Sequence, residues 1–108
     1  YATANIKPLD PFKCLPKQGV YMVRSNLHNK VHWGMLNMGT NPTFDNDSTL
    51  KIEVHFFDFN TDIYHQEICI EFLEFIRPIQ KFDTVNALYA QIALDEKYCR
   101  SKQQHYVN

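Results

Sequence analysis

The stretch Leu36–Phe56, LNMGTNPTFDNDSTLKIEVHF, decides how this chain folds. It begins with a mostly apolar run, passes through a loop rich in Asn, Asp and Thr, and ends in LKIEVHF, where apolar and polar residues alternate. Alternation with a period of two is typical of a β-strand that has one buried face. We therefore expect a strand, a polar connection and a second strand.

Segments on both sides extend this pattern. Residues 19–24 and 31–39 predict a hairpin, with the turn residues SNLHNK at 25–30 between them. A third strand is expected at residues 50–59 and a long fourth strand at residues 63–76. Consecutive strands with short connections predict an antiparallel sheet.

The last part of the chain changes to a helical period. An apolar stripe at i, i+3, i+4 and i+7 is formed by Val85, Leu88, Tyr89 and Ile92. Asp83 or Thr84 is expected to cap a helix that runs to about Ser101. A sheet this small either closes into a barrel or needs a helix over its open face, so the fold class is mainly β with a C-terminal helix.

Composition excludes several classes of protein. The 108 residues suffice for one domain, and their net charge of −1 argues against a protein that binds a phosphate backbone. No apolar run approaches the roughly 18–20 residues of a membrane span. Cys14, Cys69 and Cys99 form no CxxC pair, which indicates reduced thiols and a cytoplasmic protein. The five histidines show no zinc spacing, and no P-loop or GxGxxG motif occurs.

Three features leave a structural and a functional interpretation open. Thr3 and Asn5 would point the same way in an extended chain, either to help place Mg²⁺ or as an ordinary polar strand edge. Gly39 and Pro42 belong either to a plain connection or to a loop held close to a ligand. Glu53 faces either solvent or a semi-apolar surface, where a fixed and partly desolvated carboxylate could act as a general base.

Several motifs together resemble the riboflavin kinase domain. They are ATANI at 2–6, GVYMVR at 19–24, LNMGTNPTF at 36–44 and the run from KIEVHFFDF to NALYAQI at 51–92. In bacteria this domain is usually the C-terminal half of a bifunctional riboflavin kinase and FAD synthetase. The resemblance implies that residues 1–108 form one domain, a small six-stranded antiparallel Greek-key barrel with a C-terminal helix.

The resemblance also implies an activity, with ATP and riboflavin as substrates and a requirement for Mg²⁺. The γ-phosphate of ATP would move to the ribityl 5′-hydroxyl of riboflavin, giving FMN and ADP. Thr3 and Asn5 take the metal and nucleotide roles of the family's Pro-Thr-Ala-Asn motif, and Glu53 takes the role of the base. The Asn-Pro-Thr-Phe turn implies nucleotide contacts from Asn41, Pro42 and Thr43. The flap at residues 77–82 implies flavin contacts from Arg77, Lys81 and Phe82.

The chain departs from the family pattern at three points. Ala2 stands where Pro is usual, His65 stands where Gly is frequent, and the glycine-rich loop expected before the motif is missing. We therefore expect further residues upstream and, in the full-length protein, an N-terminal FMN adenylyltransferase domain. FAD synthesis is not assigned to this segment.

Two other functions compete with the kinase. The first is a flavin- or nucleotide-binding module without turnover, which would differ from the kinase only at Glu53, Thr3 and Asn5. The second is a small barrel that binds oligonucleotides, against which the charge of −1 and the absence of a basic stripe argue. No nucleic acid or membrane partner is expected.

Overall fold

The computed structural model describes residues 2–6, 17–40, 50–58 and 68–106, with only the backbone described for residues 2–6. Within these ranges the elements are β1 (Ala2–Ile6), β2 (Gly19–Leu27), β3 (Lys30–Gly39), β4 (Lys51–Phe56), β5 (Glu71–Arg77), α2 (Val85–Lys102) and the short 3-10 helix η1 (Gln103–Tyr106). Neither helix of these described ranges is long and apolar enough to cross a membrane.

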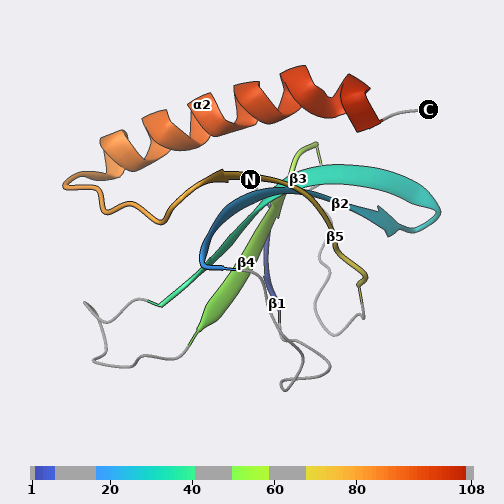
Figure 1. The fold of residues 1–108 in the computed structure, drawn as a ribbon, viewed down its shortest axis with the longest axis horizontal. Helices are drawn as coiled ribbons and strands as arrows, with labels where there is room; N and C mark the ends of the chain where they lie inside the picture. The colour runs from blue at the N-terminus through green and yellow to red at the C-terminus, as the bar shows by residue number, and fades with distance from the viewer. Residues whose placement is uncertain (1, 7–16, 41–49, 59–67, 107–108) are drawn as a thin grey trace.

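The described strands form one antiparallel sheet in the order β1-β4-β3-β2-β5. Helix α2 lies across one side of this sheet (Figure 1). The mainly β fold with a C-terminal helix is therefore confirmed. The described residues include five strands, so the sixth strand and the closure into a Greek-key barrel stay predictions.

The hairpin of β2 and β3 is confirmed, but its predicted six-residue turn at 25–30 is wrong. The strands continue until Leu27 pairs with Lys30, and only His28 and Asn29 remain in the turn. Both have positive φ, 54° and 65°. A two-residue turn with positive φ at both positions matches the right-handed twist of its strands. Residues 25–27 and Lys30, which resemble turn residues in the sequence, therefore belong to the strands.

The two later strands are shorter than predicted. Strand β4 ends at Phe56, after which Asp58 has a φ of 56° in a turn. Strand β5 begins only at Glu71; residues 68–70 are described but are not in a strand, and residues 63–67 lie outside the described ranges. The register of β5 against β2 shifts twice, as at a β-bulge, and such irregular pairing is not visible in a pattern of apolar residues.

Hydrophobic residues pack on both faces of the sheet. The first cluster is built from alternate positions of the strands: Tyr21, Val23, Leu27, Leu36, Met38, Ile52, Val54 and Phe56. The second lies on the other face, where Met22, Met35 and Phe57 meet Cys99 of α2. Thr84 caps α2 as predicted, since its hydroxyl accepts a hydrogen bond from the Ala87 amide at 3.1 Å. The first cluster thus holds the strands together on one face of the sheet, and α2 covers the other face.

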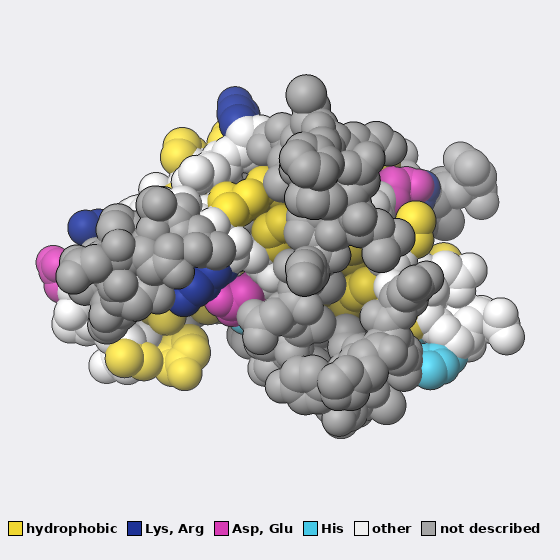
Figure 2. Space-filling model, turned by 90° about the horizontal axis from the view of Figure 1, so that it is seen from below, with side chains coloured by type: hydrophobic (Ala, Val, Ile, Leu, Met, Phe, Trp, Pro, Cys, Tyr) yellow, Lys and Arg dark blue, Asp and Glu magenta, His cyan; other side chains and the backbone are white. Residues whose placement is uncertain are grey.

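Figure 2 shows the molecule from the side away from α2. Hydrophobic side chains are visible there in several places between the parts drawn in grey. The Lys and Arg side chains visible on this face are separated from one another and form no continuous stripe among the described residues.

Candidate functional site

A cleft lies between the sheet, α2 and the segment that joins β5 to α2. It consists of two adjoining cavities of about 420 and 580 Å³. Both are lined by Asn37 of β3, Glu53 of β4, Phe82 of the connecting segment and Leu88 of α2. A concave site of this size, with apolar walls and a few polar groups, is typical of a small-molecule site.

Glu53 lies at the junction of the two cavities. Its neighbours Ile52 and Val54 are buried in the first cluster, so alternation along β4 places Glu53 on the face toward α2. The side chain is half-buried. In the register of the sheet, Glu53 is paired with Asn37 on β3 and with Asn5 on β1. The acid therefore occupies a fixed position on a central strand, between two amide-bearing residues.

His55 is the next residue of β4 on the same face and also lines the cleft. Burial lowers the pKa of His55 below its usual 6.5, although the charge of Glu53 acts in the opposite direction. The imidazole is consequently uncharged at neutral pH. Lys51 precedes Glu53 by two residues on the same strand face and lines the second cavity with it.

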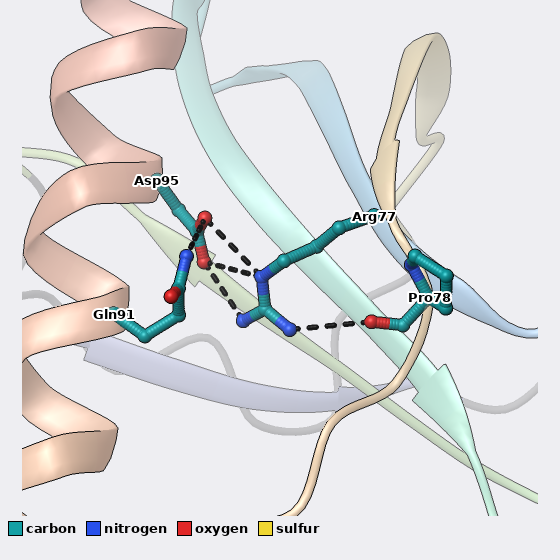
Figure 3. Close-up of polar contacts among 4 residues, drawn as sticks. All are labelled: Arg77, Pro78, Gln91 and Asp95. Carbon is teal, nitrogen blue, oxygen red and sulfur yellow. Dashed lines mark hydrogen bonds and ion pairs between the residues drawn. The ribbon is translucent and has the colours of Figure 1, made fainter.

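An ion pair at the side of the cleft joins the end of β5 to α2 (Figure 3). Arg77 donates from Nε and Nη2 to the Asp95 carboxylate at 2.8–3.2 Å, and its Nη1 donates to the Pro78 carbonyl at 3.3 Å. The Gln91 amide donates to the same carboxylate at 3.0 Å. The Arg77 guanidinium also lies 5.9 Å from the centre of the Phe82 ring.

The apolar stripe of α2 divides into a packed part and an exposed part. Cys99 is fully buried and Ile92 packs on the second cluster, whereas Val85 and Tyr89 are 62% and 61% exposed. Leu88 and Tyr89 line the cleft. The period correctly predicted the helix, but it could not show that half of the stripe borders a cavity.

The predicted site residues fall into three groups. Glu53, Arg77 and Phe82 line the first cavity, and Lys81 lines the second together with Glu53 and Phe82. Thr3 and Asn5 are described only as backbone, in register with His55 and Glu53. The remaining three, Asn41, Pro42 and Thr43, lie outside the described residues.

Asn37, His55 and Asp95 are among the cleft residues that the sequence did not predict as site residues. Asn37 and His55 are each on the same strand face as a residue already singled out, so the strand alternation could have indicated them. Asp95 follows Ile92 on the apolar stripe, and an acid at such a position is a recognisable signal. Its partner Arg77 could not be paired with it, because 18 residues and a change of element separate them.

This chain is similar to known proteins over most of its length. A family model described as riboflavin kinase (flavokinase) matches residues 1–103. The bifunctional riboflavin kinase/FMN adenylyltransferase of Listeria monocytogenes is 40% identical over 101 residues, covering 94% of this chain and 32% of that protein. The protein of the same name from Bacillus subtilis is 35% identical over 99 residues, covering 90% and 31%.

A solved structure is also similar. It is titled a macrolide-efflux protein from Streptococcus pneumoniae, and it aligns with a TM-score of 0.81 and 37% identity. The alignment covers 93% of this chain and 32% of that one. The chain spans about a third of the length of these relatives. The match of the family model over nearly all of the sequence shows that this chain belongs to the riboflavin kinase family.

Proposed function

We propose that this chain acts as a riboflavin kinase domain and transfers the γ-phosphate of ATP to the 5′-hydroxyl of riboflavin, giving FMN and ADP. The observation that supports this most strongly is the position of Glu53, half-buried at the junction of two cavities in a member of this family. Phosphoryl transfer depends mainly on positioning and charge stabilisation, so one oriented acid beside a cleft is an adequate protein contribution.

Glu53 would accept the proton of the ribityl hydroxyl as that oxygen bonds to phosphorus. A general base has to lie within hydrogen-bond reach of the proton it removes, and the strand register fixes Glu53 between Asn37 and Asn5. The amide of Asn37, which also lines both cavities, is placed to orient the carboxylate or a ribityl hydroxyl.

The two cavities suit different parts of the substrates. Leu88, Tyr89 and Phe82 give the first cavity an apolar and aromatic wall, on which the flat flavin ring can stack. The second cavity is lined by Thr40, Lys51 and Lys81. Residues 41–43 follow Thr40 directly, so we assign this second part to the nucleotide, with contacts from Asn41, Pro42 and Thr43. The proposed flavin contacts remain Arg77, Lys81 and Phe82, of which Phe82 lines both cavities.

Mg²⁺ is assigned to Thr3 and Asn5 together with the phosphates of ATP. Neutral side-chain oxygens combined with phosphates and water are a usual environment for this ion. In the described ranges, no group of three or more His, Cys, Asp or Glu could hold a metal. The pairing of Asn5 with Glu53 supports the assignment to Thr3 and Asn5, because it places the motif on the strand next to the base. The ion would neutralise the charge on the transferring phosphoryl group.

The sheet order supports the Greek-key connection of the six-stranded barrel that we propose. Strands β2, β3 and β4 are successive antiparallel neighbours, while β1 lies beside β4 at the end of the row. This is the Greek-key arrangement traced from its last strand to its first. We further propose a single domain over residues 1–108, a cytoplasmic location and, from the names of the relatives, an FMN adenylyltransferase domain elsewhere in the full-length protein.

The test is FMN formation from riboflavin, ATP and Mg²⁺, followed by chromatography. The parent protein should form FMN, chelation of Mg²⁺ should abolish it, and Glu53→Gln should slow turnover by roughly 10²–10⁴-fold, the usual effect of losing a general base. Glu71→Gln is the control, since this exposed acid of β5 pairs with Arg24 outside the cleft. Riboflavin binding without any FMN formation would instead show the binding module, and unchanged turnover in Glu53→Gln would exclude this residue as the base.

A further inference from the structure

Asp95 is buried in α2, and its carboxylate accepts three hydrogen bonds from Nε and Nη2 of Arg77 and one from Gln91 (Figure 3). Asp95 is 4% exposed, and the Arg77 side chain is 17% exposed. A buried ion pair is weak evidence for stability, because desolvation of both charges offsets their attraction. The location of the pair in the cleft wall suggests that its role concerns the site.

Arg77 contacts the segment that follows β5 at two points. Its Nη1 donates to the carbonyl of Pro78, the first residue of the segment, and its guanidinium lies near the ring of Phe82. Between these two points, Ile79 and Gln80 line both cavities. An interaction that holds the Arg77 guanidinium in place therefore also holds the segment Pro78–Phe82 in place.

We infer that Asp95 is a positioning residue: it holds Arg77 against α2, and through Arg77 it sets the wall Pro78–Phe82 that faces Glu53 across the cleft. Gln91 supports it by fixing the carboxylate one helical turn away. Nε and Nη2 both point to one carboxylate, so the planar guanidinium has a single orientation, which Lys could not provide. The inference rests on the proposed function, because the ligand that this wall meets is the flavin.

The double variant Arg77→Met/Asp95→Leu separates a role in the site from stability, and Asp95→Asn, which keeps Arg77, separates positioning by Asp95 from a direct contact of Arg77 with the flavin. Apolar replacement of both members of a buried ion pair is often neutral or stabilising for the fold. A structural role alone then predicts parent-like behaviour in every respect. The positioning role predicts an unchanged melting temperature, a dissociation constant for riboflavin raised roughly 10- to 100-fold, and a KM for riboflavin that rises more than the KM for ATP, because misplaced walls weaken binding and orientation.

Riboflavin binding is measured by quenching of flavin fluorescence without ATP. The control is Arg24→Met/Glu71→Met, which removes the 2.6 Å pair between β2 and β5 away from the cleft and should bind riboflavin like the parent. The single variant Asp95→Glu, which keeps the carboxylate, should retain most of the parent's affinity for riboflavin. If the first double variant does not fold, Arg77→Gln/Asp95→Asn is judged by the same criteria.

The outcomes separate the two proposals. Parent-like riboflavin affinity in a folded double variant would overturn the inference and leave the kinase assignment intact. A parent protein that neither binds riboflavin nor forms FMN would overturn the proposed function itself.

Discussion

The two faces of β4 have the same backbone and opposite environments. On one face Ile52, Val54 and Phe56 are at most 6% exposed and belong to the first cluster. On the other, Glu53 and His55 are only half-buried and border the cleft under α2. A single residue step along the strand thus separates the interior from the candidate active site.

This difference shows how a small sheet can combine rigidity with access for a substrate. The closely packed face holds the strands in one register, and register fixes which residues are opposite one another. On the open face, the same register places Glu53 beside Asn37 and Asn5. Substitutions on the two faces should therefore affect different properties, stability on one and catalysis or binding on the other.

The largest effect on folding is expected from Leu36→Ala, on the packed face. Leu36 is 1% exposed in the first cluster, and its truncation leaves a cavity that lowers the free energy of unfolding by about 2–5 kcal/mol. Urea denaturation measures this change. The kcat of the molecules that remain folded should equal that of the parent, and a large fall in kcat at full folding would contradict the division between the faces.

A smaller effect, on binding alone, is expected from Tyr89→Ser. The ring of Tyr89 is mostly exposed on the cleft side of α2, so its loss should leave the free energy of unfolding within about 0.5 kcal/mol of the parent. Loss of an aromatic stacking partner should weaken riboflavin binding by about 0.5–1.5 kcal/mol, measured by fluorescence titration. Unchanged affinity would show that the flavin ring does not stack on Tyr89.

The smallest effect is a change in the pH dependence of stability with His55→Asn. Burial lowers the pKa of His55 in the folded protein, so the unfolded chain takes up a proton first as the pH falls below about 6.5. The parent should therefore lose stability from that pH downward, and the variant should lose less. His32, whose pKa burial also lowers, leaves a residual slope. Identical slopes in the two proteins would show that His55 does not contribute.

The sequence predicted the elements better than their ends. Periods of two and of 3.6 residues identify β2, β3, β4 and α2, because burial on one face leaves a regular pattern. The turn at His28 and Asn29 and the late start of β5 depend on twist and irregular pairing, which leave no such pattern.

Residues of the candidate site could be predicted from the sequence where they lie on a single strand, but not where two elements meet. Alternation separates Glu53 from Ile52 and Val54 without any structure. The contact between Arg77 and Asp95 joins a strand end to the middle of a helix, so only the packed fold reveals it. The resemblance to a family indicated Arg77 but not its partner.

The central claim is that Glu53 faces the hydroxyl that receives the phosphoryl group. A crystal structure of the protein with riboflavin, Mg²⁺ and ADP measures this directly. We predict that the 5′-oxygen lies about 2.6–3.2 Å from a carboxylate oxygen of Glu53, inside the cleft under α2. A ribityl chain that ends at another side of the sheet, with Glu53 facing only solvent, would contradict the account.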